Sequence, residues 1–192
     1  MISIENSCCF TGYRSEKFDF NLSKDDPHYK DFCSRLMGAI NNLIAKGCTK
    51  FYTGMATGFD IEAAEYVALI KKLNKDIRLI AVIPFKNQEK GWNEEWKRRY
   101  IDLLDCADET VVLNEKYEKW AFSQRNRYMV DRCRYVITYF DGKSGGTAST
   151  VNYAFKNCRE IINISETDPN AKENDRFNAY FGIVPPDITY LK

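Results

Sequence analysis

Six short apolar runs alternate with stretches of helical periodicity along this chain, and the alternation is what most limits its possible folds. Most of the runs are continuously apolar, as expected of strands buried on both faces. Between them, apolar residues recur every three or four positions, which is the period of an α-helix. Strands that alternate with helices form a parallel sheet through right-handed crossovers. We therefore predict an α/β fold, a three-layer sandwich with a mainly parallel, doubly wound sheet.

The predicted elements fill one domain of 192 residues. Its core runs from about residue 7 to 164, and 165–192 form a C-terminal extension, polar at first and ending in a strand or coil. The predicted strands are Ser7–Thr11, Lys50–Thr53, Arg78–Ile83, Glu109–Leu113, Tyr135–Phe140 and Glu160–Ile164. The predicted helices are Pro27–Lys46, Asp60–Leu73, Glu89–Leu104, Phe122–Cys133 and Thr147–Asn157.

Composition excludes several classes of function. The 28 basic and 27 acidic residues leave a net charge of +1, so we expect neither nucleic acid nor a membrane as a partner. The single histidine, His28, excludes a zinc site with two histidine ligands, and we expect no metal site. Seven cysteines without a C-x-x-C pair indicate buried thiols in a reducing cytoplasm. No apolar run reaches the ~20 residues that a membrane span needs.

Ligands of open parallel sheets bind at the carboxyl ends of the strands. The residues at the carboxyl ends of the predicted strands and just after them are therefore the candidate ligand-binding residues. They are glycines, hydroxyls, an arginine, two carboxylates and a Pro-Phe pair: Thr11, Gly12, Arg14, Thr53, Gly54, Gly58, Asp60, Pro84, Phe85, Asp141, Gly145, Gly146 and Thr147. To these we add Arg125 and Asn126, polar residues near the start of a helix, although a solvated helix face would also explain them.

Gly145-Gly146-Thr147 opens the last predicted helix. Backbone N–H groups at a helix N-terminus bind phosphate, and glycines let the anion approach closely. The alternative is a flexible turn in which Thr147 caps the helix. Arg14 is a candidate phosphate clamp, with an ordinary surface arginine as the alternative.

Asp60 allows three interpretations. With Thr57 it matches the [ST]-x-x-[DE] pattern of a capping box, a purely structural role. As a ligand residue it would accept hydrogen bonds from ribose hydroxyls, since a carboxylate repels phosphate. It is also a candidate general acid–base group, together with Glu65 on the same helix. Tyr117 and Trp120 fall in a predicted lid, where an aromatic ring could stack on a base.

Six blocks of the sequence resemble the YpsA-like family, part of the SLOG superfamily of Rossmann-like proteins. The resemblance covers about residues 8–164 and implies a Rossmann-like fold. The blocks are Phe10–Arg14, Gly54–Asp60 with Ala63-Ala64-Glu65, Ile83–Phe85, Gln88 with Trp92, Arg125-Asn126 with Met129–Asp131, and Asp141-Gly142 with Gly145–Ala148.

The resemblance implies a pocket for nucleotides or nucleotide-derived molecules such as ADP-ribose-like compounds. It also implies a relationship to the lysine-decarboxylase-like phosphoribohydrolases, which are dimers and carry P-G-G-x-G-T-x-x-E with a catalytic glutamate, and to a DNA-protecting recombination protein. In this chain Ala148, Ser149 and Asn152 stand where Gly, Thr and Glu would be. The phosphate-binding half of the motif is present and the catalytic glutamate is not.

Two functions follow from these residues. The first is a sensor or sequestering protein that binds a nucleotide-derived small molecule (ADP-ribose-like, cyclic or mononucleotide) and requires no cofactor. The second is a hydrolase that cleaves an N-glycosidic or phosphodiester bond of a nucleotide with carboxylates such as Asp60 or Glu65. A DNA-processing role is a third option, which the near-zero net charge disfavours. The sequence is also compatible with a homo-oligomer.

Overall fold

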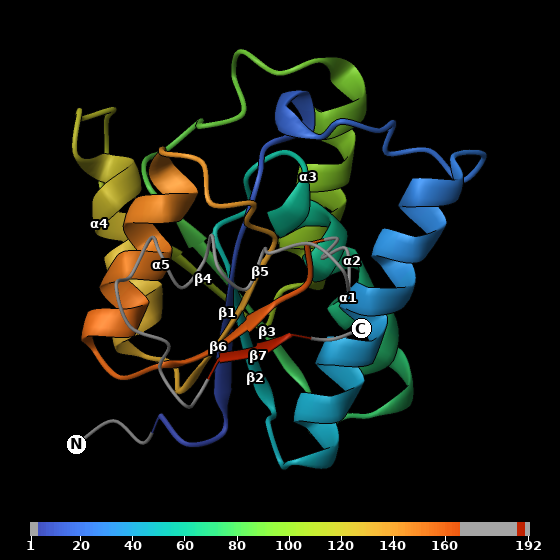
Figure 1. The fold of residues 1–192 in the computed structure, drawn as a ribbon. Helices are drawn as coiled ribbons and strands as arrows, with labels where there is room; N and C mark the ends of the chain where they lie inside the picture. The colour runs from blue at the N-terminus through green and yellow to red at the C-terminus, as the bar shows by residue number, and fades with distance from the viewer. Residues whose placement is uncertain (1–3, 166–187, 191–192) are drawn as a thin grey trace.

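The computed structural model describes residues 4–165 and 188–190 and has a seven-stranded, entirely parallel sheet (Figure 1). The predicted Rossmann-like α/β class is confirmed. The strands are β1 (Ser7–Thr11), β2 (Lys50–Thr53), β3 (Arg78–Ile83), β4 (Glu109–Val112), β5 (Tyr135–Thr138), β6 (Glu160–Asn163) and β7 (Ile188–Tyr190).

The strand order is β4-β3-β2-β1-β5-β6-β7. The chain builds outward from β1 to β4 on one side, then crosses back and continues from β5 on the other side. The order therefore reverses between β1 and β5, which pair in register from Cys8 with Tyr135 to Thr11 with Thr138. Such a reversal leaves a crevice outside the carboxyl ends of the two strands, the usual ligand site of open α/β sheets.

Helices cover both faces of the sheet (Figure 1). One apolar core joins the sheet to α1–α3 and contains Leu36, Ala64 and Leu103. The other joins it to α4 and α5 and contains Met129 and Val151. The helices are η1 (Ser15–Lys17, a 3-10 turn), α1 (Pro27–Ala45), α2 (Phe59–Leu73), α3 (Glu94–Cys106), α4 (Ala121–Asp131) and α5 (Gly146–Lys156).

Two helices begin where local hydrogen bonds place them. Asp26 caps α1 by accepting a hydrogen bond from the His28 N–H, as an Asp-Pro start predicts. The expected start of α3 at Glu89 is wrong, because Asn93 caps the helix by accepting a hydrogen bond from the Trp96 N–H at 3.0 Å. Trp92 therefore precedes the helix, and its ring packs edge-on against Tyr100.

Part of the C-terminal extension joins the sheet. Residues 188–190 form β7, which pairs in parallel with β6. Ser165, the first residue of the extension, is buried, and 166–187 lie outside the described residues. Within the described part, no helix is long and apolar enough to span a membrane, and no three His, Cys, Asp or Glu side chains gather as metal ligands would. All seven cysteines are free thiols; four are buried, and Cys33, Cys106 and Cys158 are at least partly exposed.

Candidate functional site

A cavity of about 240 Å³ opens at the carboxyl edge of the sheet, beside the end of β1. Its walls come from the loop after β1, the approach to α2 and its first turn, α4, and the first turn of α5. The lining residues are Thr11, Gly12, Tyr13, Arg14, Lys17, Ala56, Thr57, Asp60, Phe122, Arg125, Asn126, Gly146 and Thr147. Eight of the residues predicted from the sequence are thus brought together, although segments up to 136 positions apart contribute them.

Two glycines allow the loop after β1 to lie directly against the start of α2. A Cβ at Gly12 would lie 2.4 Å from the Phe59 ring. A Cβ at Gly58 would lie 2.5 Å from the Ser15 backbone nitrogen, and Gly58 also has a positive φ of 83°. The contact is closed by a hydrogen bond of 3.0 Å from the Phe59 N–H to the Tyr13 carbonyl. Gly12 lines the cavity and Gly58 holds its wall in place.

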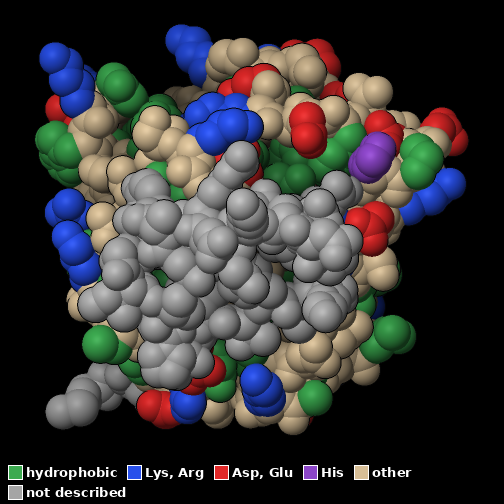
Figure 2. Space-filling model, in the orientation of Figure 1, with side chains coloured by type: hydrophobic (Ala, Val, Ile, Leu, Met, Phe, Trp, Pro, Cys, Tyr) green, Lys and Arg blue, Asp and Glu red, His purple; other side chains and the backbone are tan. Residues whose placement is uncertain are grey.

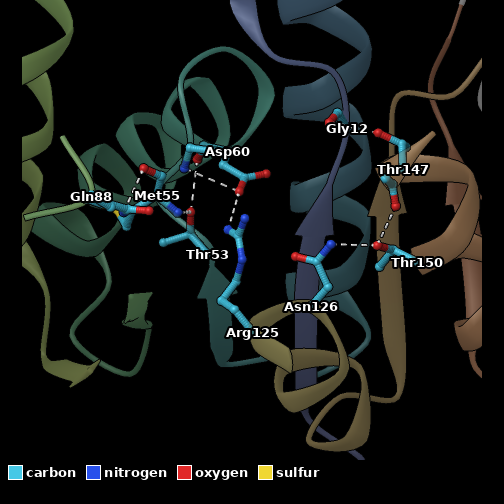
Figure 3. A network of polar contacts seen from close by, with 11 residues as sticks. Gly12, Thr53, Met55, Asp60, Gln88, Arg125, Asn126, Thr147 and Thr150 are labelled. Carbon is cyan, nitrogen blue, oxygen red and sulfur yellow. Dashed lines mark hydrogen bonds and ion pairs between the residues drawn. The ribbon is translucent and has the colours of Figure 1, made fainter. Parts of the chain in front are cut away.

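A buried ion pair forms the floor of the cavity. Arg125 reaches from α4 to Asp60 in the first turn of α2, and its Nη1 lies 3.0 Å from Asp60 Oδ2 (Figure 3). The two side chains are only 6% and 8% exposed. Burial raises the pKa of Asp60 and lowers the pKa of Arg125, and in each case the partner's charge opposes the shift. Each residue therefore depends on the other to carry its charge out of water.

Gly54 leaves the space that the Arg125 guanidinium occupies. A Cβ at Gly54 would lie 1.2 Å from Arg125 Nη1 and 2.7 Å from Asp60 Oδ2. No side chain at this position is compatible with the ion pair. Gly54 does not line the cavity, so its role is to let the arginine reach Asp60.

The loop between β2 and α2 is held by side-chain hydrogen bonds to its backbone (Figure 3). The Thr53 hydroxyl donates to the Asp60 carbonyl at 3.1 Å and accepts from the Met55 N–H at 3.2 Å. The Gln88 amide donates to the Met55 carbonyl at 3.3 Å. Thr53 is fully buried; it holds the Asp60 backbone and does not line the cavity.

The expected capping box of Thr57 and Asp60 is wrong. Gly58 is the N-cap of α2 and makes no side-chain capping bond. Asp60 Oδ2 instead accepts a hydrogen bond of 3.4 Å from the Ala56 N–H and pairs with Arg125. The carboxylate turns to the buried cation because a charge pair is stronger than a capping bond.

The first turn of α5 contributes Gly146 and Thr147 to the wall of the cavity. Gly145 is the N-cap, with a φ of 150° that favours glycine, and none of the described side chains caps the helix. The Thr147 hydroxyl, considered as a cap, donates instead to the Gly12 carbonyl at 3.0 Å (Figure 3). This bond ties α5 to the end of β1. The uncapped turn keeps the orphan donors and the positive dipole end that bind anions.

Two further cations line the cavity. The Arg14 guanidinium lies over the Phe122 ring at 5.1 Å, and neither Arg14 nor Lys17 forms an ion pair with another described residue. No sequence pattern marks Lys17 as a site residue. It reaches the cavity because the 3-10 turn η1 turns the chain back. Asp60 is the only carboxylate among the described residues that line the cavity, and Arg125 neutralises it. The cavity is therefore positively charged.

Other predicted site residues lie around the cavity but do not line it. Phe85, next to Pro84, contacts Tyr117 and Phe122 with ring centroids 5.3 and 5.6 Å apart. This aromatic cluster supports the Phe122 ring under Arg14. Tyr117 and Trp120, expected in a lid, are 59% and 50% exposed. The Pro84 carbonyl accepts a hydrogen bond from Asn114 at 2.7 Å.

Asp141 follows β5 and pairs with residues of the neighbouring loops. Its carboxylate accepts a hydrogen bond from the Tyr13 hydroxyl and pairs with Lys143 Nζ at 2.6 Å. Burial would raise the pKa of Asp141, but the hydrogen bonds from Lys143 and Tyr13 outweigh it and lower the pKa. Asp141 therefore positions Tyr13, which lines the cavity, but Asp141 itself does not line the cavity.

Glu65 is brought to a different place from Asp60. It pairs with Arg99 of α3, with Oε1 2.7 Å from Nε, and the same guanidinium contacts Glu62 at 2.7 Å. Arg99 also lies 4.4 Å over the Trp96 ring. Glu65 therefore belongs to the contact between α2 and α3 and does not line the cavity.

Comparison with known proteins gives the family. The YpsA family model, described as "YspA SLOG family", matches residues 8–166. The chain belongs to the YpsA family of SLOG proteins. Similar relatives are the SPbeta prophage-derived protein YoqJ of Bacillus subtilis (strain 168), 32% identical over 64% of this chain and 79% of YoqJ, and a UPF0398 protein of Staphylococcus epidermidis, 28% identical over 68% of this chain and 70% of its own.

Solved structures with the same fold include DNA processing protein A (DprA) of Streptococcus pneumoniae, with a TM-score of 0.61 at 20% identity. The match covers 95% of this YpsA-family chain but only 58% of that DprA chain. DprA of Helicobacter pylori matches with a TM-score of 0.60 at 17% identity over 94% and 74% of the two chains, and its structure is described by its single-stranded DNA binding mode.

These neighbours contradict the expectation that nucleic acid is not a partner, which rested on net charge. A net charge of +1 averages over the whole surface and hides a local group of cations. Arg14 and Lys17 form such a group in this YpsA-family protein, while acidic residues elsewhere balance the total.

Proposed function

We propose that the cavity beside β1 binds the phosphate and ribose of a nucleotide-derived ligand. The phosphate accepts hydrogen bonds from the N–H groups of the first turn of α5, beside Gly146, and pairs with Arg14 and Lys17. The proposal rests mainly on what meets at this one cavity, in the crevice beside β1. The start of α5 there has no side-chain cap, and Arg14 and Lys17 form no ion pair with another described residue. No bound cofactor is needed for this role.

The residues favour binding over hydrolysis. A carboxylate that acts as a general acid or base must be free to exchange a proton with the ligand. Asp60 is held by Arg125 at 3.0 Å, and Glu65 by Arg99 at 2.7 Å outside the cavity. Asn152 takes the place of the catalytic glutamate of the related phosphoribohydrolases and faces a groove between α4 and α5. A sensor or sequestering protein fits these residues better than an N-glycosidase.

Single-stranded DNA is the second candidate ligand. The specific support is the fold shared with DprA, one structure of which is described by its single-stranded DNA binding. A nucleotide unit within a DNA strand carries the same phosphate and sugar, so the same cavity serves both proposals.

Calorimetric titration with AMP, ADP-ribose, cyclic AMP and oligodeoxythymidylate tests the proposal. We expect at least one of them to bind the wild-type protein and Arg14→Gln to weaken its binding about 10-fold or more, the effect of one charge-assisted contact. A matched control is Arg78→Gln, which removes an exposed arginine at the amino end of β3, whereas the cavity lies at the carboxyl edge of the sheet. The proposal fails if none of the ligands binds, or if Arg14→Gln and Arg78→Gln have the same effect.

A further inference from the structure

A second hollow of about 440 Å³ lies between α4 and α5 and adjoins the cavity. The two share three lining residues, Phe122, Asn126 and Gly146. Asn126 stands at the junction, where its amide donates to the Thr150 hydroxyl at 2.7 Å and that hydroxyl donates to the Gly146 carbonyl at 2.9 Å (Figure 3). We call this hollow the α4–α5 groove.

The α4–α5 groove is cationic. Three of its described lining residues are basic (Lys119, Arg127 and Lys156), and none is acidic. These three side chains are exposed and form no ion pair with another residue in the part of the chain that the structure describes. In the view of Figure 2, Lys and Arg side chains stand along the edge of the molecule where Figure 1 places α4 and α5.

The cavity beside β1 is small, so a ligand longer than one nucleotide would extend beyond it. Its 240 Å³ lies below the range of about 300–1,000 Å³ typical of small-molecule pockets, whereas the α4–α5 groove lies within that range. Gly146 opens α5 and Lys156 ends it, so the groove runs for about 15 Å along the helix at 1.5 Å per residue. A ligand that leaves the cavity past Gly146 enters a path lined by positive charge.

We infer that the α4–α5 groove is a second phosphate subsite, occupied by a phosphate joined to the nucleotide unit in the cavity. This inference rests on the proposed function and narrows it to ligands with at least two separated phosphates. Arg127, which lies 5.3 Å over the Tyr153 ring, and Lys156 pair with the second phosphate from the two sides of the groove. The linked phosphate is supplied either by a dinucleotide or by the next nucleotide of a DNA strand.

The test compares three probes: AMP, the linear dinucleotide pApA and a 12-nucleotide oligodeoxythymidylate. The variant Arg127→Gln/Lys156→Gln removes two groove charges, and Lys72→Gln/Lys75→Gln removes two exposed charges elsewhere. We expect the groove variant to weaken binding of pApA or the oligonucleotide at least 10-fold and AMP less than 2-fold. The control variant should change each of them less than 2-fold.

The outcomes separate the inference from the proposed function. If the groove variant loses affinity for pApA alone, the ligand is a dinucleotide. If it loses affinity for the oligonucleotide alone, the ligand is single-stranded DNA. Either result supports a phosphate subsite in the α4–α5 groove. If the groove and control variants bind the extended probes equally well, the groove is not a phosphate subsite. If AMP binding still depends on Arg14 in that case, the proposed function of the cavity stands. Absence of binding by all three probes overturns both.

Discussion

Arg125 and Asp60 are 65 positions apart in the chain and form a buried ion pair at the floor of the candidate site, with Nη1 3.0 Å from Oδ2. Removing one member of a buried pair costs about 3–5 kcal/mol, because the other charge stays buried without a partner. We predict that Asp60→Asn and Arg125→Gln each destabilise the fold by about this amount and that the double variant costs clearly less than their sum.

Urea unfolding of the four proteins in this cycle measures the coupling. The pair of Lys86 and Glu115 is a suitable control, since its side chains are 54% and 76% exposed and such pairs contribute about 0–1 kcal/mol. Strictly additive effects of Asp60→Asn and Arg125→Gln would show that the pair does not behave as a unit.

Gly54→Ala should reproduce the loss of Arg125. The new methyl group would lie 1.2 Å from Arg125 Nη1, so the guanidinium must leave Asp60. We expect a loss of stability of about 3 kcal/mol or more in chemical unfolding, and little additional loss when Arg125→Gln is combined with it. A fully stable Gly54→Ala protein would mean that the arginine takes another path.

Gly146→Ala separates ligand binding from folding. Gly146 is the first residue of α5 and lines the cavity, and a Cβ at this position would meet no described atom within 4 Å, so alanine fits the fold. The methyl group would enter the space proposed for the phosphate, and we expect thermal stability to be kept while AMP affinity falls about 10-fold. Gly38→Ala in α1, also with open space, is the control and should add about 0.5–1 kcal/mol without changing affinity. Equal affinities of the two variants would place the phosphate elsewhere.

Asp141 gives the fold a dependence on acid pH. Its pKa in the folded protein is lowered from the ordinary value of 3.8, despite burial, by the hydrogen bonds from Lys143 and Tyr13. The stability that it contributes is therefore fully present above the unfolded value and is lost as pH falls through the lower folded pKa. Wild type should exceed Asp141→Asn in stability at pH 7, and the difference should shrink below pH of about 4. A difference that stays constant from pH 7 to pH 2.5 would contradict this assignment.

The sequence predicts the sheet and the edge that carries the site, because buried strands are continuously apolar and ligands bind at their carboxyl ends. It does not predict which side chains pair across the site. Asp60 and Glu65 illustrate the difference: they are five residues apart, about 140° around the helix at 3.6 residues per turn, so only Asp60 can face the cavity. Pairing with Arg125 depends on the packing of α4, to which no local pattern in the chain points.

Net charge and local periodicity missed two other features for the same reason. Lys17 reaches the cavity through a 3-10 turn in a stretch without helical or strand periodicity. The α4–α5 groove arises from two helices that are separate in sequence, and its three basic residues are scattered over 38 positions. Only the fold brings them to one surface.

In the function proposed for this protein, a phosphate holds the ligand in the cavity beside β1. Calorimetric titration of the wild-type protein with AMP and with adenosine tests this most directly, because the two ligands differ only in that group. We predict that AMP binds at least 10-fold more tightly than adenosine, as expected from one or more charge-assisted hydrogen bonds. Equal affinities, or binding of adenosine alone, would contradict a phosphate-centred site.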